Sequence, residues 1–452
     1  MHATQLLVVR PAGGWTSTPG LMRMARAAII IGCGLLGYVA WTTVTSAHTT
    51  VATIGQQTAR SIMGVRELRA RLVELDESAS NDLLAGGFGS ASARARYDTS
   101  QQEVSRLLVQ AAQSATNDND RHAVDQVVGL VTRYNGLVQA ARANNRQVLP
   151  VGASYQNVAS KLMHQQLLPL VDQLDKSYTA RMQYQYDRQV SAFTIGQVLG
   201  VGVGVMLIAV LVGTQLFLTR RTRRLINIPL AIGTAVVVVF TAWLSLGLHS
   251  SSTELSAGAK PAFDALYRLW QVRATATDAK GDISLFLIAR GNGEAFEKSF
   301  TEKTTSLANA PTTDARSGQP AGRGGVRTGQ MAEALKGVSS REQTDLLEEA
   351  VASFDSWMQF QNWIRELEKQ GQHQQAVDLT LANDTGSATE AFQHFDQAIG
   401  KVMEINQRDF DQAIGQALGV LSWLIVAGVT VAVIVSILAS VGLAPRLKEY
   451  QV

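Results

Sequence analysis

Four long apolar segments limit what this chain can fold into. Each contains no Asp, Glu, Lys or Arg, and they cover residues 27–44, 192–218, 225–248 and 417–444. A helix needs roughly 20 apolar residues to cross the roughly 30 Å hydrocarbon core of a bilayer. The first segment is the shortest, but the chain stays uncharged through Thr58. We therefore predict four transmembrane helices.

Basic residues next to these segments predict which side of the membrane each end faces. They are Arg10, Arg23 and Arg26 before the first segment, Arg220, Arg221, Arg223 and Arg224 between the second and third, and Arg446 and Lys448 after the last. Lys and Arg beside a span mark its cytoplasmic side. We predict a multi-pass cell-membrane protein whose N-terminus, C-terminus and basic loop are cytoplasmic, with the four loop arginines as candidate contacts for a cytoplasmic partner.

The charge of the remaining chain excludes a nucleic-acid partner. Taking these nine basic residues and the acidic Glu449 from totals of 40 and 37 leaves 31 basic against 36 acidic residues. The sequence pI of 8.9 therefore reflects membrane anchoring, and not a basic surface for nucleic acid.

Processing of the first segment stays open. Met22 to Ala47 has a basic start, an apolar centre and small residues at its end, so cleavage after Ala47 is the alternative to an uncleaved span. The single cysteine, Cys33, allows no disulfide framework.

The two halves of the sequence repeat each other. A shift of 202 residues aligns "YVAW" at 38–41 with "FTAW" at 240–243, and "IGQVLGV" at 195–201 matches "IGQALGV" at 414–420. The first shift also aligns Arg66 with Arg268, Arg71 with Arg273, and Asp76 with Asp278. The second half is longer because of the Gly-, Pro- and Arg-rich residues 308–329, which we expect to form a mobile external loop.

Helical periodicity fills both segments between the spans. Helices are expected near 47–85, 91–115, 120–146 and 153–190, and near 253–289, 294–307, 330–337, 340–370 and 373–412. Ser339 with Glu342, and Ser387 with Glu390, have the spacing of capping boxes.

The predicted fold is an all-α membrane protein in which four transmembrane helices carry two tandem extracytoplasmic four-helix bundles, formed by internal duplication. The expected domains are a cytoplasmic arm (1–26), transmembrane helix 1 (27–46), bundle 1 (47–191), transmembrane helix 2 (192–218), a basic loop (219–224), transmembrane helix 3 (225–248), bundle 2 (249–416), transmembrane helix 4 (417–444) and a cytoplasmic tail (445–452).

The repeated Arg, Arg, Asp set is the best candidate for specific polar chemistry. Its members are Arg66, Arg71 and Asp76 in the first half and Arg268, Arg273 and Asp278 in the second. Spacings of five place successive members about 140° apart on a helix, so the three cannot share one face. They could form ion pairs between helices or bind a carboxylate ligand or a partner. Arg290 and Glu294, in the turn "IARGNGEAF", either cap a helix or belong to such a site.

Two further patterns concern packing. Gly196, Gly200 and Gly204, and likewise Gly415 and Gly419, recur at every fourth position and predict close helix contacts in lipid. Phe354, Trp357, Phe360 and Trp363 fall three apart and predict a core stripe, with a partner-docking groove as the alternative.

No pattern indicates catalysis. The seven histidines lack metal-ligand spacing, and no nucleophile motif, phosphate-binding loop or carboxylate constellation appears, so we expect no enzyme, metal or cofactor. Transport is disfavoured because the spans contain no charged residue.

The strings "NRQVLPVGASYQNVASKLM" at 145–163 and "GDISLFLIARGNGEAFEKSF" at 281–300, together with the tandem arrangement, resemble the GlnX-like family of actinobacterial amino-acid-sensing transmembrane proteins. The resemblance covers most of the chain and implies two partners, a GlnH-like extracytoplasmic solute-binding lipoprotein and a PknG-like cytoplasmic Ser/Thr kinase. More distantly, each half is similar to chemoreceptor four-helix sensor domains, although no HAMP or methyl-accepting helix follows the spans.

The sequence thus predicts a non-enzymatic relay in the lipid bilayer that couples extracytoplasmic amino-acid availability to a kinase. The short cytoplasmic parts can dock a protein but cannot signal alone. A sensor that binds a small ligand directly, and a structural envelope scaffold, are the alternatives. Homodimerisation, the identity of the ligand and the direction of signalling stay open.

Overall fold

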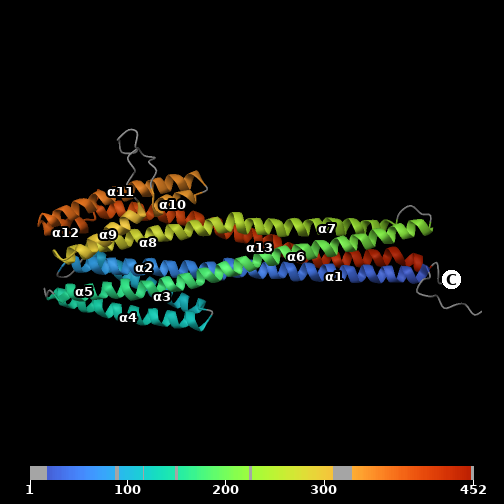
Figure 1. The fold of residues 1–452 in the computed structure, drawn as a ribbon, viewed down its shortest axis with the longest axis horizontal. Helices are drawn as coiled ribbons and strands as arrows, with labels where there is room; N and C mark the ends of the chain where they lie inside the picture. The colour runs from blue at the N-terminus through green and yellow to red at the C-terminus, as the bar shows by residue number, and fades with distance from the viewer. Residues whose placement is uncertain are drawn as a thin grey trace, which may run out of the picture. The chain divides into compact units, whose positions relative to one another are not determined.

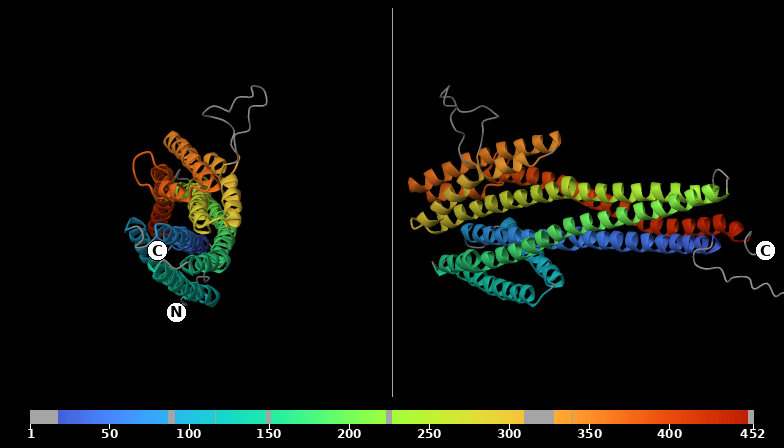
Figure 2. Two further views of the ribbon diagram at one scale, coloured as in Figure 1. Left: turned by 90° about the vertical axis from the view of Figure 1, so that its left-hand side faces the viewer. Right: turned by 45° about the vertical axis from the view of Figure 1, so that its right-hand side comes forward.

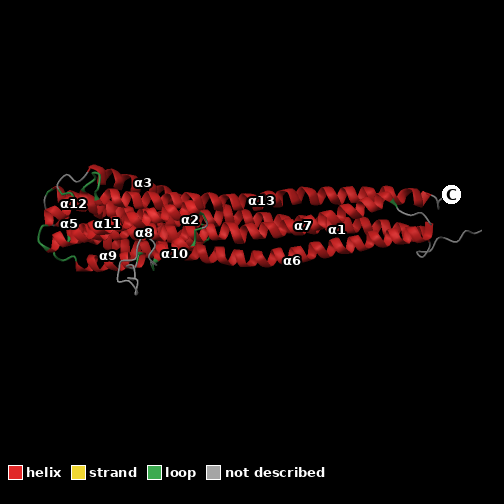
Figure 3. Ribbon diagram, turned by 90° about the horizontal axis from the view of Figure 1, so that it is seen from above, coloured by secondary structure: helices red, strands yellow, loops and turns green. Residues whose placement is uncertain are grey.

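The computed structural model describes residues 18–86, 91–115, 117–147, 151–222, 227–308, 328–338 and 340–448. Every regular element among them is a helix, and these residues contain no strand (Figure 3). The all-α prediction is confirmed for this part of the chain. The protein divides into two compact units. We call Met1–Thr53, Gln185–Ser256 and Ala413–Val452 the apolar unit, and Ile54–Tyr184 with Ala257–Gln412 the polar unit.

The apolar unit contains α1 (Thr18–Ala52), α7 (Ile228–Thr253) and parts of α6 (Leu168–Thr222) and α13 (Ala388–Lys448). Among the residues that the structure describes, four helical stretches are long and apolar enough to cross a membrane. They are Gly20–Ala52, Ile195–Arg220, Ile228–Ile288 and Ala388–Ala444. Each overlaps one of the four predicted spans, and the second and third begin three residues later than predicted.

Small residues bring the four helices of the apolar unit together (Figure 1). A Cβ built on Gly37 of α1 would lie 3.1 Å from Ala432 of α13, and one on Gly247 of α7 would lie 2.7 Å from Leu424 of α13. The opposite faces are also apolar, since Ile31 and Trp423 are each 70% exposed. A helix that is apolar on all sides is typical of a membrane span, because lipid chains solvate the outward-facing apolar side chains more favourably than water does.

The first half of the polar unit is built from α2 (Ala59–Leu84), α3 (Ala91–Ser114), α4 (Asp118–Arg146), α5 (Val151–Leu162) and the beginning of α6. α2 packs on α3, and α4 packs on α5. Tyr97 and Tyr134 are fully buried between them. Asn117 caps α4 by accepting a hydrogen bond from the backbone N–H of Asp120 at 2.7 Å, which fixes where that helix begins.

The second half contains α8 (Lys260–Ile288), α9 (Glu294–Leu307), α10 (Gln330–Lys336), α11 (Arg341–Lys369), α12 (His373–Leu381) and the beginning of α13. Its core is aromatic. Phe354 and Trp357 of α11 contact Phe392 and Phe395 of α13 with ring centroids 5.3–5.6 Å apart, a range typical of favourable aromatic pairs.

Two sequence predictions in this half are corrected. Phe354 and Trp357 belong to the core, but Trp363 is 56% exposed, because a spacing of three drifts off a helix face of period 3.6 and the buried face continues at Gln361 and Ile364. The capping box of α11 joins Ser340 and Gln343, one residue later than predicted, since Ser340 is the residue with extended backbone.

The second predicted cap and the predicted loop have different outcomes. Ser387 accepts a hydrogen bond from the Glu390 N–H at 3.2 Å, while the Glu390 carboxylate accepts one from Gly386 and not from Ser387. The loop expected at 308–329 lies outside the described residues, except for its ends.

The two halves of the polar unit meet where α2 packs along α8. In Figure 2 the first-half helices (blue to green) and the second-half helices (yellow to red) of this unit lie on either side of that contact. The segments expected to form separate bundles, 47–191 and 249–416, thus contribute to one compact unit.

In the part of the chain that the structure describes, three short π-helical turns interrupt the long helices, and no sequence pattern predicted them. They are η1 (Thr53–Thr58), η2 (Met163–Leu167) and η3 (Glu254–Ala259). η1 and η3 occur at equivalent places in the two halves, and each lies where the chain passes from the apolar to the polar unit. π-turns often mark functional positions in helices.

Candidate functional site at the contact of α2 and α8

The contact between α2 and α8 is polar although it is buried. In α2 the segment "DESASND", residues 76–82, is buried at every position, including Asp76, Glu77 and Asp82. In α8, Asp282 and Ser284 are also buried. Burying charged groups costs free energy unless they are paired and hydrogen-bonded, so the partners of these side chains decide what the contact can do.

Five side chains form an alternating row of charges across the contact, which we call the charged seam: Asp76, His164, Asp278, Lys303 and Asp282. His164 Nε2 lies 3.3 Å from Asp76 Oδ2 and 3.6 Å from Asp278 Oδ1. Lys303 Nζ lies 2.9 Å from Asp278 Oδ1 and 2.7 Å from Asp282 Oδ2. Asp76 and Asp278, which are equivalent in the sequence repeat, thus meet at one histidine.

Asp76 also receives hydrogen bonds from its own half. The Tyr134 hydroxyl donates to Asp76 Oδ1 at 2.9 Å, and the Ser160 hydroxyl donates to Asp76 Oδ2 at 2.8 Å. The carboxylate is therefore held by α4 and α5 as well as by His164 of η2. Asp76 thus joins α2 to α4, α5 and η2, and His164 of η2 continues the contact to Asp278 of α8.

Burial and neighbouring charges shift the pKa values of the seam in different ways. Burial raises the pKa of Asp282 to about 6, although Lys303 opposes the shift. Burial disfavours the imidazolium of His164, but the hydrogen bond to Asp76 and the charges of Asp278 and Asp76 outweigh it, so its pKa is raised. Burial likewise disfavours charged Lys303, and Asp278 and Asp282 outweigh it and raise its pKa. The seam therefore contains a carboxyl group, Asp282, whose pKa is raised to about 6, and a histidine, His164, whose pKa is raised from its ordinary value.

More polar contacts flank the seam. Lys280 Nζ of α8 lies 2.9 Å from Glu77 Oε1 of α2, and the Ser284 hydroxyl donates to Asn81 Oδ1 at 2.5 Å. A buried ion pair such as Lys280–Glu77 adds little net stability, but removal of one partner is costly. These contacts fix how α2 lies along α8.

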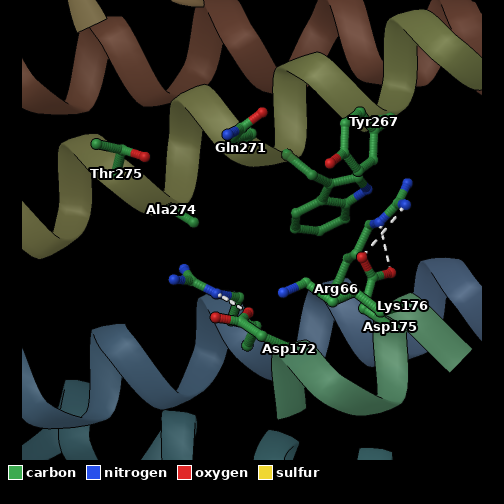
Figure 4. Close-up of a pocket in the computed structure, with 10 residues that line it drawn as sticks. Arg66, Asp172, Asp175, Lys176, Tyr267, Gln271, Ala274 and Thr275 are labelled. Atoms are coloured by element: carbon green, nitrogen blue, oxygen red, sulfur yellow. Dashed lines mark hydrogen bonds and ion pairs between the residues drawn. The ribbon is translucent and has the colours of Figure 1, made fainter. Parts of the chain in front are cut away.

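Arg66 links the two halves at another point of α2. Its Nε donates to Asp175 Oδ1 of α6 at 2.8 Å, and its guanidinium stacks on Tyr267 of α8, 3.9 Å from the ring centroid. Arg69 Nε similarly donates to Asp172 Oδ1 of α6 at 2.6 Å. A hollow of about 300 Å³ opens beside these pairs, with α8 on one side and α2 and α6 on the other (Figure 4).

The remaining members of the repeated set face different neighbours. Arg273 donates to both carboxylate oxygens of Asp396 in α13, at 2.5 and 2.8 Å. Arg71 pairs within α2, its Nη1 lying 2.7 Å from Glu74 Oε2. Arg268 donates to the backbone carbonyl of Glu333 at 3.0 Å. Arg71 and Arg273 line a second hollow of about 130 Å³. Ion pairs between helices, one of the two alternatives, are thus present for Arg66, Arg273 and Asp278.

Arg290 and Glu294 are not brought to the site. Arg290 is exposed in a left-handed turn with φ of 40°, and Glu294 is the exposed first residue of α9. A carboxylate there favours the helix N-terminus, which fits the capping alternative.

The glycines predicted for helix packing fall into two groups. A Cβ on Gly196 would overlap Thr43 of α1, and one on Gly204 would overlap Thr241 of α7, while Gly200 approaches Leu244. Gly415 and Gly419 are exposed, and a Cβ there would meet no atom within 4 Å. For these two the predicted contact is wrong within this chain, because α13 buries Ala413, Ala417 and Leu421 instead.

The basic loop is only partly described. Arg220 is exposed near the end of α6, Arg221 belongs to that helix, and Arg223 and Arg224 lie outside the described residues.

Several site residues were not singled out from the sequence: His164, Asp172, Asp175, Lys176, Asp282, Lys303 and Asp396. None repeats between the halves at the spacing that identified Asp76 and Asp278, so internal repetition could not find them. Over the residues that the structure describes, no group of three or more His, Cys, Asp or Glu is placed to hold a metal ion.

Residues 50–187 match the protein family described as Actinobacterial sensor domain. The match includes Arg66, Asp76, His164 and Asp175, and therefore the whole first-half side of the α2–α8 contact. No curated protein and no solved structure matches the chain. The family match supports an actinobacterial sensor family and a role in sensing or signalling, and a sensor domain beside four apolar helices fits a membrane protein.

Proposed function

We propose that the protein is a non-enzymatic transmembrane relay of the GlnX-like type. In this proposal it couples extracytoplasmic amino-acid availability, presented by a solute-binding lipoprotein, to a cytoplasmic Ser/Thr kinase. The polar unit is extracytoplasmic, and both termini and the loop at 219–224 are cytoplasmic, as the basic residues indicate.

One observation carries the proposal: the same helices serve both units. α6 is a single helix from Leu168 to Thr222, and α13 is a single helix from Ala388 to Lys448. Each contributes its first part to the polar unit and its later part to the apolar unit. A tilt, rotation or shift of such a helix at one end moves side chains at the other, as in known bistable helix shifts.

The charged seam supports a contact with more than one packing. At this point α2 and α8 are joined directly by the Lys280–Glu77 ion pair, and through His164 of η2, which lies between Asp76 and Asp278. Ionic contacts of this kind add little net stability while every charge is paired, and they are costly when one charge loses its partner. A partner that docks on the polar unit can therefore shift α2 against α8 for a modest difference in binding free energy.

The experiment is affinity capture of the detergent-solubilised full chain, with and without Asp, Glu, Asn and Gln, followed by mass spectrometry. Recovery of a solute-binding lipoprotein and a Ser/Thr kinase, at least one of them dependent on an amino acid, supports the relay. Recovery of neither contradicts it: direct binding of an amino acid by the purified chain would then favour a sensor, and no binding would favour the scaffold.

Orientation is tested separately. In a Cys33→Ser background, Ser356→Cys places a thiol in the polar unit and Thr222→Cys places one in the basic loop at 219–224. A membrane-impermeant maleimide applied to intact cells is expected to label the first variant and not the second. The reverse pattern would refute the proposed topology.

A further inference from the structure

The hollow beside Arg66 has the walls of a small-molecule site. α8 contributes Tyr267, Gln271, Ala274 and Thr275, and α6 contributes Asp172, Asp175 and Lys176 on the facing side (Figure 4). Its volume of about 300 Å³ lies at the lower end for ligand pockets. The ligand is therefore small, and a peptide or a folded partner would not fit.

The charges that line the hollow do not balance. Arg66 pairs with Asp175, and Arg69 pairs with Asp172. Lys176 is exposed and has no ion pair with any residue that the structure describes. Three cationic side chains face two carboxylates, so the hollow keeps one positive charge available for a single negative charge on a ligand.

The rest of the wall combines the aromatic Trp270 and Tyr267 with Ala274 and the uncharged polar Gln271 and Thr275. Trp270 is partly buried and lies between the two hollows of the α2–α8 contact, since it lines both of them. Tyr267 is 41% exposed, and Arg66 stacks on its ring. Tryptophan and tyrosine bury large areas of ligand at little conformational cost. A bare inorganic anion would leave this part of the wall unused.

We propose that this hollow binds a small organic monocarboxylate with an apolar or aromatic body. The Lys176 ammonium binds the carboxylate, and Trp270 with Ala274 contacts the body, while the Asp172 and Asp175 carboxylates disfavour dianions. Because the walls come from α2 and α6 of one half and α8 of the other, the bound ligand holds the two halves in one packing.

The inference deepens the proposed sensing role by giving the polar unit a ligand of its own. Its test uses purified protein without partners, so its failure is distinguishable from failure of the relay. Ligand-observed NMR on the full chain in detergent measures binding of benzoate and hexanoate, with benzamide as the neutral isostere and inorganic phosphate as the bare anion.

Three variants accompany these probes. Lys176→Gln removes the unpaired charge, Trp270→Leu removes the aromatic wall, and Lys401→Gln is the matched control, an exposed lysine of α13 that does not line the hollow. At least one carboxylate is expected to bind about tenfold or more tightly than benzamide. Lys176→Gln is expected to weaken it about tenfold, equivalent to about 1.4 kcal/mol, and Lys401→Gln to leave it unchanged.

Other outcomes overturn the inference. These are no saturable binding of either carboxylate, equal binding of benzamide, displacement by phosphate at equal concentration, or an unchanged affinity in Lys176→Gln. Lys176 is exposed, so its replacement is not expected to unfold the helix, and unchanged helical content by circular dichroism checks this for both hollow variants.

Discussion

Loss of the Asp76 carboxylate tests whether the charged seam holds the polar unit together. In Asp76→Ala, the buried Tyr134 hydroxyl loses its acceptor at 2.9 Å, the Ser160 hydroxyl loses its acceptor at 2.8 Å, and His164 loses one of its two carboxylates. A buried polar group left without a partner costs about 1–3 kcal/mol. Two hydroxyls lose their acceptor, so we expect the free energy of opening of α2 and α4 to fall by about 2–6 kcal/mol.

Two further variants separate charge from hydrogen bonding. Asp76→Asn keeps an oxygen that can accept from Tyr134 but loses the negative charge beside His164, so a smaller loss of about 1–2 kcal/mol is expected. Tyr134→Phe removes one donor, and a double-mutant cycle between Tyr134→Phe and Asp76→Asn isolates their coupling. Asp125→Ala, an exposed carboxylate on α4, is the matched control.

Hydrogen exchange measured by mass spectrometry on the full chain in detergent is the suitable assay, because it reports local opening where a single unfolding temperature would mix two units. Faster exchange in α2 and α4 peptides of Asp76→Ala, with Asp125→Ala unchanged, is the expected result. Equal exchange in the two alanine variants would show that the seam contributes nothing to holding these helices.

Three further predictions concern pH, an ion pair and the apolar unit. The raised pKa values of His164 and Asp282 mean that the polar unit is most stable when both groups are protonated. Its stability should fall as the pH rises through about 6 for Asp282 and above 6.5 for His164, so hydrogen exchange of polar-unit peptides, corrected for intrinsic exchange rates, should report a lower opening free energy at pH 8 than at pH 5. His164→Gln should remove the part of this fall above about 6.5, and an unchanged slope would contradict the assignment. Arg273→Lys keeps the charge but loses the bidentate hydrogen bond to Asp396, so the opening free energy of α8, measured by hydrogen exchange, should fall by about 1–2 kcal/mol. Arg408→Lys, an exposed site on α13, is the control and should not change exchange. Gly204→Ala places a methyl against the Thr241 side chain and should destabilise the apolar unit by about 1–3 kcal/mol in detergent. Gly202→Ala is the control, because a Cβ there meets no atom within 4 Å, and it should leave stability unchanged. Equal effects of the two variants would refute the packing argument.

Periodicity and charge patterning predicted most of the helices. The expected 91–115, 294–307 and 340–370 correspond to α3, α9 and α11 within one residue at each end. Apolar runs and turn residues are local signals, so they locate helices well. The π-turns were not predicted, because each is one turn inside a longer helix, and the apolar patterns before and after it are both helical.

The site was only half predictable. Repetition pointed to Asp76 and Asp278, but their convergence on His164 depends on α2 packing along α8, a contact between segments about 200 residues apart. Nothing local in the sequence specifies which faces of two such helices meet. Trp363 is a prediction that went wrong for a different reason. The spacing of the aromatic residues of α11 predicted that its ring is buried in the core, but Trp363 is exposed.

The meeting of Asp76 and Asp278 also bears on how such a protein could have arisen. Under the predicted duplication, two identical copies of one ancestral half would have placed two identical carboxylates against each other, a repulsive arrangement across a two-fold axis. Lys303 breaks this equivalence, since the first half has Gln101 at the matching position under the shift of 202 residues. Fusion into one polypeptide would let each copy acquire its own counter-charge, which a symmetric dimer of a single gene product cannot do.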